Sequence, residues 1–114
     1  MKYIGALLLL GISVFANDIE VTILYGNGKP DNVIQTTYTP GMSALEVLQK
    51  VSSVQTSKTG KFLFVRSIDA VQSQIGKFGW FYLIDGESVP TTAQNYLLKD
   101  AKKMLWIYKV EACY

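Results

Sequence analysis

One stretch of this chain repeats apolar residues at helical spacing, and segments that alternate like strands lie on both sides of it. Ser43, followed three residues later by Glu46, forms a capping box in which each side chain satisfies a free backbone N–H group. The following apolar residues share one helical face: Ala44, Leu45, Val47, Leu48, Val51 and Val54. Ser52-Ser53 and the run 55–60 should end the helix. The sequence therefore predicts one helix in a fold made mostly of strands.

The strand candidates surround this helix. Residues 19–25 alternate between apolar and polar side chains, the turn-rich run 26–31 follows, and residues 33–39 read as the returning strand of a hairpin. Three further candidates are residues 61–68, 79–85 and 104–110, and the segment 86–103 is rich in loop residues. The order ββαβββ predicts an α+β fold, with a β-grasp-like mixed sheet of about five strands packed on the helix.

The first sixteen residues read as a secretory signal. Lys2 supplies a positive start, residues 4–15 are apolar, and Val14-Phe15-Ala16 resembles a cleavage site. The apolar run is shorter than the roughly 20 residues that a membrane-spanning helix needs. We therefore expect a signal peptide at 1–16 and one domain at 17–114, exported to the periplasm or secreted by a bacterium, without a membrane span after cleavage.

Charge and cysteine content exclude several classes of protein. Without Lys2, ten of the eleven basic residues remain against nine acidic ones, so the chain has no basic surface typical of nucleic-acid binding. A single cysteine, Cys113, cannot form an internal disulfide framework. Cys113 could link two chains into a dimer, but a free terminal thiol is the simpler interpretation.

The chain shows no assembled catalytic or metal-binding residues. It contains no histidine, which removes the commonest general base and a common zinc ligand. Asp85 and Glu87 are the only closely spaced acidic pair, and Asp85-Gly86 is better explained as a tight turn. Residues 26–29, Gly-Asn-Gly-Lys, lack the length and the following Ser or Thr of a phosphate-binding loop. We predict neither an enzyme nor a metal site.

Aromatic residues are concentrated in the last two strand candidates. Alternation places Trp80 and Tyr82 on one face of their strand, and Trp106 and Tyr108 on one face of theirs. The opposite faces carry a second apolar set, formed by Phe81, Leu83, Leu105 and Ile107. One set should pack beneath the helix. The other is either ordinary half-buried strand surface or an exposed patch that binds a partner.

The spacing of these motifs resembles that of a known family. A Ser-x-Leu helix start, a strand ending Arg66-Ser67-Ile68, the run GWFYxxDG from Gly79, and a closing Leu-Trp-x-Tyr strand together resemble the transcobalamin-like C-terminal domain family over residues 19–109. The resemblance implies a β-grasp-like domain. In animal cobalamin carriers the related domain covers one face of the corrinoid, and a separate helical barrel holds the other. This chain has no room for such a barrel, and Ala101-Lys102 replaces the family's usual Gly-Asp turn.

The resemblance and the aromatic residues together suggest an exported, non-catalytic binding domain. A cobamide, another corrinoid or a similar flat molecule is the ligand that the resemblance implies. Trp80, Tyr82, Trp106 and Tyr108 would stack on it, with Asp85 at the polar rim. The alternative is a protein-interaction or adhesion module, in which the aromatic face or an open sheet edge binds another envelope protein.

Overall fold

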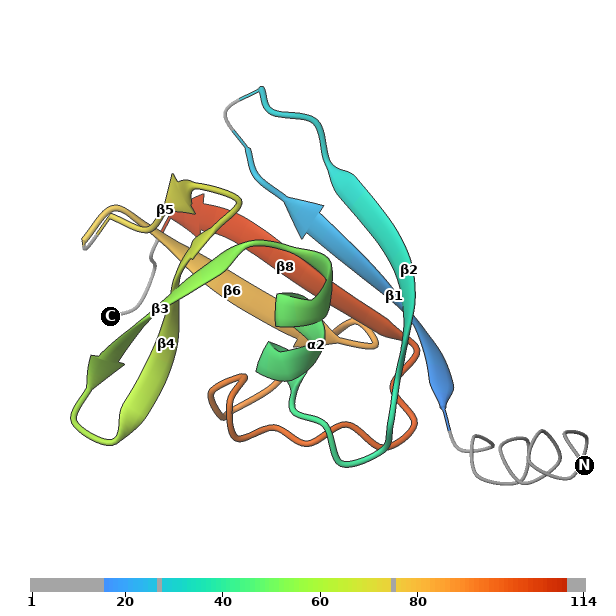
Figure 1. Cartoon of the computed structure of the whole chain (residues 1–114). Helices are drawn as coiled ribbons and strands as arrows, with labels where there is room; N and C mark the ends of the chain where they lie inside the picture. Colours follow the sequence, from blue (N-terminus) through green and yellow to red (C-terminus); the bar gives the residue numbers. More distant parts are fainter. Residues whose placement is uncertain (1–15, 27, 75, 111–114) are drawn as a thin grey trace, which may run out of the picture.

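We describe the fold from a computed structural model that places residues 16–26, 28–74 and 76–110 (Figure 1). Cys113 and the predicted signal sequence before Ala16 lie outside these described residues. The elements are β1 (Asn17–Leu24), β2 (Asn32–Tyr38), α2 (Ala44–Val51), β3 (Val54–Thr59), β4 (Phe62–Ile68), β5 (Val71–Gln72), β6 (Phe78–Ile84), β7 (Glu87–Ser88) and β8 (Lys103–Val110). No helix among the described residues has the length and apolar character needed to cross a membrane.

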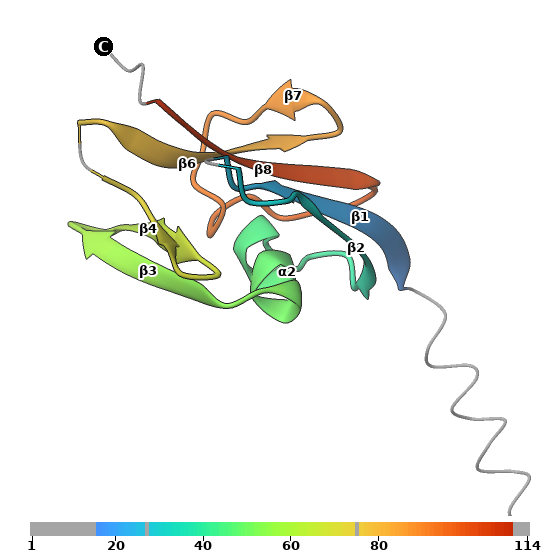
Figure 2. The same cartoon turned by 90° about the horizontal axis from the view of Figure 1, so that it is seen from above.

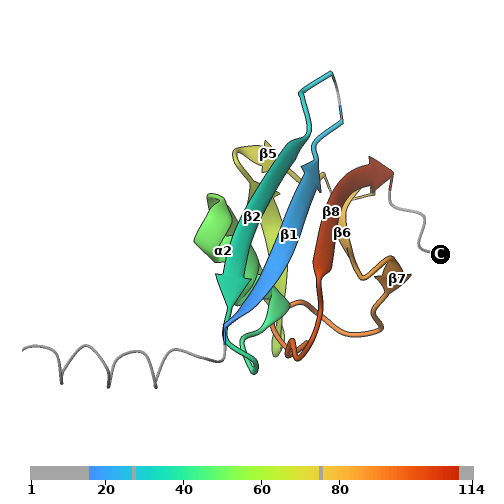
Figure 3. The same ribbon diagram turned by 90° about the vertical axis from the view of Figure 1, so that its right-hand side faces the viewer.

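The main sheet has the mixed five-stranded form that the sequence predicts. Its order is β2-β1-β8-β6-β7, in which β1 and β8 are parallel and the other neighbours are antiparallel. The chain's first and last strands therefore lie side by side at the centre of the sheet (Figure 3). The β1–β2 hairpin, the helix α2 and the central parallel pair confirm the α+β, β-grasp-like prediction.

The helix α2 begins as its capping box predicts. The backbone N–H of Glu46 donates to Ser43 Oγ at 3.1 Å, and the Ser43 N–H donates to Glu46 Oε1 at 2.8 Å. The helix ends sooner than the apolar spacing suggests, because Ser52 takes an extended conformation and its hydroxyl donates to the Leu48 carbonyl. Val54, expected on the helix face, instead starts β3.

A second, three-stranded sheet was not expected from the sequence. Residues 55–60, which we expected only to end the helix, belong mostly to β3, and β3 pairs antiparallel with β4. The predicted strand at 61–68 is confirmed as β4, but it lies in the sheet β3-β4-β5 and not in the main sheet. This second sheet lies on the same side of the main sheet as α2, whereas β7 lies toward the other side (Figure 2).

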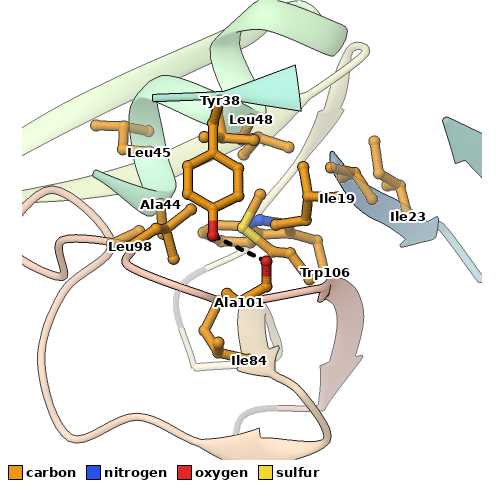
Figure 4. Packing of buried hydrophobic residues seen from close by; sticks show 14 of the residues in the cluster. Ile19, Ile23, Tyr38, Ala44, Leu45, Leu48, Ile84, Leu98, Ala101 and Trp106 are labelled. Carbon is orange, nitrogen blue, oxygen red and sulfur yellow. Dashed lines mark hydrogen bonds between the residues drawn. The ribbon is translucent and has the colours of Figure 1, made fainter. Parts of the chain in front are cut away.

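The core fills the space between α2 and the main sheet (Figure 4). Ile19, Val21 and Ile23 from β1 are at most 1% exposed, and Trp106 from the adjacent β8 is 2% exposed. Tyr38 crosses this core from β2, and its hydroxyl donates to the Ala101 carbonyl at 2.9 Å. The contact fixes the segment that leads into β8 against the first hairpin.

Candidate functional site

A groove lies between β4 of the second sheet and β6 of the main sheet, and we call it the β4–β6 groove. Its volume is about 660 Å³, within the range of small-molecule sites. Phe62 to Val65 of β4 form one wall, Trp80 to Leu83 of β6 form the other, and the chain from Ser88 to Gln94 closes one end. Leu45 of α2, together with Trp106, Ile107 and Lys109 of β8, completes the lining.

The structure brings the four predicted aromatic residues together on the helix side of the sheet. Trp80 pairs with Tyr108 and Tyr82 pairs with Trp106, with ring centroids 5.1 and 5.0 Å apart. Trp106 and Tyr108 are almost fully buried, and Trp80 and Tyr82 are half-buried against the same core. This set therefore serves first as core, although Trp80, Tyr82 and Trp106 also line the groove.

Hydrogen bonds hold the polar tips of three of these four rings, whereas the buried Trp106 Nε1 has no hydrogen-bond partner among the described residues. Trp80 Nε1 donates to the Val71 carbonyl at 2.9 Å, and the Tyr108 hydroxyl donates to the Gln72 carbonyl at 2.7 Å. Tyr82 donates to the Thr91 carbonyl at 2.6 Å. Burial, with a smaller contribution from Tyr96, raises the pKa of Tyr82 to about 12. These bonds fix the ring positions, so the groove presents ring faces and edges that are already oriented.

The opposite face of β6 and β8 carries the second apolar set. Phe81, Leu83, Leu105 and Ile107 are half-buried on the side away from α2. Phe81, Leu83 and Ile107 also line the groove, and Lys109 Nζ lies 4.9 Å from the Phe81 ring centroid. The groove therefore extends around the edge of β6 onto both faces of the sheet.

The predicted polar residue, Asp85, lies outside the groove lining. Asp85 and Gly86 have φ values of 50° and 85° and form the tight turn from β6 to β7, as the sequence predicts. Asp85 Oδ1 accepts hydrogen bonds from the backbone N–H groups of Lys102 and Lys103, both at 2.9 Å. The carboxylate thus anchors the start of β8.

Two exposed phenylalanines of β4 add to the groove wall and were not among the predicted site residues. Phe62 and Phe64 are 46% and 47% exposed, and their ring centroids lie 6.3 Å apart. Their alternation in β4 is visible in the sequence, but nothing local shows that β4 lies opposite β6. Among the described residues, no group of three or more His, Cys, Asp or Glu side chains could hold a metal ion.

The fold and the groove together define a β-grasp-like domain with an apolar cleft between its two sheets. The chain belongs to the DUF4430 family, described as a domain of unknown function, whose profile matches residues 41–110. No curated protein matches the chain.

Two solved structures are similar in fold to this chain. Haptocorrin in complex with Cbi aligns over 83% of this chain with a TM-score of 0.71 and 12% identity. A protein from Ruminococcus gnavus ATCC 29149, described as a "putative metal binding protein", aligns over 83% with a TM-score of 0.64 and 22% identity. The match spans 25% of the haptocorrin chain and 98% of the Ruminococcus chain. The predicted transcobalamin-like character is therefore supported at the level of the fold.

Proposed function

We propose that this protein is a non-catalytic binding domain and that the β4–β6 groove is its ligand-binding surface. The observation that carries this proposal is the groove itself, about 660 Å³ in volume and lined by aromatic and aliphatic side chains from two sheets. Binding sites for small molecules have this character, with few polar groups among apolar walls. The fold shared with haptocorrin, which was solved with Cbi, supports the same class of function.

A corrinoid such as cobinamide is the first ligand to test. Phe64 on one wall and Phe81 on the other offer ring surfaces to a flat molecule, and Lys109 is the only charged residue among the described residues of the lining. The groove is open, so a broad ring system would be covered on one side only. We therefore expect weak binding by the isolated domain, with a dissociation constant between about 10 μM and 1 mM.

Equilibrium dialysis of the purified domain against cobinamide and cobalamin tests this proposal, because it avoids the overlap of corrinoid absorption with tryptophan emission. Phe64→Ala should weaken binding at least fivefold, and the exposed position of Phe64 should leave the fold intact. Val33→Ala is the matched control, since Val33 is also exposed but lies on β2, outside the groove lining. Absence of binding at millimolar corrinoid would contradict the choice of ligand.

We also propose that the protein acts outside the cytoplasm. The support is the sequence of residues 1–16, with its single basic residue, apolar run and Val-Phe-Ala end. Fractionation of cells that express the natural chain, with mass spectrometry of the mature N-terminus, tests this. A mature form that begins at Asn17 in the periplasm or medium is the expected result, and an intact N-terminus in the cytosol would contradict it.

A further inference from the structure

The strand β6 has an edge that its neighbours cover only at the two ends. Along its whole length β6 pairs with β8 on one side. On the other side, β7 pairs only with Leu83 and Ile84, and Gln74 forms an isolated bridge with Phe78. Among the described residues, no strand pairs with the intervening segment 79–82 on this side. Residues 80–82 of this open segment line one wall of the β4–β6 groove.

The register shows which backbone groups point into the groove. At the start of β6, Phe78 exchanges both of its backbone hydrogen bonds with Gln74, on the side away from β8. Backbone groups alternate in direction along a strand, so Trp80 and Tyr82 direct their N–H and C=O groups to the same side. Phe81 directs its groups to β8. The open segment therefore presents two donors and two acceptors at strand spacing, within a length of about 13 Å.

The shape of the groove matches an extended chain placed beside this edge. The lining includes Tyr82 from the helix side of the sheet and Phe81 from the opposite side. A strand added to β6 would direct alternate side chains to these two faces, as strands in a sheet do. Phe62 and Phe64 of the facing wall would cover it from the other side.

The charges around the groove define the kind of chain that fits. Lys109 lies on the Phe81 side of β6, and among the described residues it is the only charged one in the lining. The β3–β4 hairpin, whose residues 62–65 form the facing wall, carries Lys58, Lys61 and Arg66 outside the lining and has no acidic residue. An extended segment with acidic side chains toward Lys109 and apolar side chains toward Tyr82 complements both faces.

We propose that the open edge of β6 binds an extended peptide segment of a partner protein, alternating apolar and acidic residues, by strand addition. Backbone hydrogen bonds to Trp80 and Tyr82 supply the affinity, and Lys109 selects the acidic side chains. This form of recognition is common where a sheet edge lies beside side-chain pockets. The inference goes beyond the proposed function, because it requires no small ligand.

The test uses blocked five-residue peptides of alternating valine and glutamate, with a valine–lysine peptide for comparison. Amide hydrogen exchange followed by NMR should show protection of the Trp80 and Tyr82 amides by at least tenfold at saturating valine–glutamate peptide, with no change at Phe81. N-methylation of one alternate set of peptide amides should weaken binding at least tenfold. N-methylation of the other set should change it less than twofold, because those amides face away from β6.

Two charge reversals test the choice of partner. Lys109→Glu should reverse the preference between the two peptides, whereas Lys99→Glu, at an exposed position outside the groove lining, should leave it unchanged. The inference would be overturned if millimolar peptide left the amide hydrogen exchange of Trp80 and Tyr82 unchanged. Equal binding of the two N-methylated forms of the peptide would also overturn it. Because corrinoid binding is measured separately, peptide binding without corrinoid binding, or the reverse, shows which proposal has failed.

Discussion

Asp85 offers a sharp test of how this fold is held together, because its carboxylate accepts hydrogen bonds from two backbone N–H groups. Its Oδ1 accepts from the N–H groups of Lys102 and Lys103, and its own N–H donates to the Lys103 carbonyl at 2.9 Å. These contacts join the β6–β7 turn to the start of β8, across seventeen residues of chain. Asp85 also has a φ of 50°, which aspartate tolerates better than alanine.

The loss of stability expected for Asp85→Ala follows from these contacts. A hydrogen bond to a charged group contributes about 1.5–3 kcal/mol, and exposure of Asp85 to solvent reduces this to about 1 kcal/mol for each of the two bonds. Alanine at a positive φ costs about 1 kcal/mol more. Asp85→Ala should therefore lower the free energy of unfolding by about 2–3 kcal/mol, and the melting temperature by about 8–20 °C for a domain of this size.

Three variants separate the two contributions. Asp85→Asn keeps an acceptor and the tolerance for positive φ, so we expect a loss of about 1 kcal/mol. Asp85→Gly removes both bonds without the strain and should lie between the Asn and Ala variants. Glu87→Ala, two residues away on the exposed strand β7, is the matched control and should change stability by less than about 0.5 kcal/mol.

Urea denaturation followed by tryptophan fluorescence measures all four variants, with ligand binding measured on each folded protein. The reasoning is refuted if Asp85→Ala unfolds at the same urea concentration as Glu87→Ala. Asp85 lies outside the groove lining, so the folded variants should bind ligands like the parent protein. A selective loss of corrinoid binding in Asp85→Asn would instead support the polar-rim role predicted from the sequence.

Two further predictions concern tyrosines. Tyr38→Phe should lower the free energy of unfolding, measured by urea denaturation, by about 1–2 kcal/mol, because it leaves the buried Ala101 carbonyl without its donor. The control is Tyr96→Phe, whose hydroxyl has no hydrogen bond among the described residues, and it should cost less than about 0.5 kcal/mol. Equal losses in the two variants would contradict this prediction. Burial raises the pKa values of Tyr25 and Tyr82 from 10.0 to about 12, with the Asp69 hydrogen bond contributing at Tyr25. As the pH rises, these tyrosines lose their protons in the unfolded chain before they do so in the folded protein. The free energy of unfolding should therefore fall between pH 10 and 12, with no change from this cause below pH 9. Titration of all tyrosines of the folded protein near pH 10, followed by ultraviolet absorption, would contradict this prediction.

The sequence predicts best where local contacts determine the structure. The capping box of Ser43 and Glu46 joins residues three positions apart, and the helix starts there because these bonds form within one turn. The Asp85-Gly86 turn is similarly local, since both residues tolerate the positive φ that it requires. Strand alternation also correctly predicts that Trp80 and Tyr82 lie on the same face of their strand.

Contacts between distant segments determine the end of the helix, the face of the sheet that is buried and the position of the groove. Val54 fits the helical spacing, but the chain leaves the helix at Ser52, and the Ser53 N–H donates to Asp69, sixteen residues away. Alternation states which aromatic residues share a face and not which face α2 covers, because that depends on how the helix crosses the sheet. The β4–β6 groove likewise depends on contacts between segments that are distant in the sequence. Its walls are strands of two different sheets, and only tertiary packing places them opposite each other.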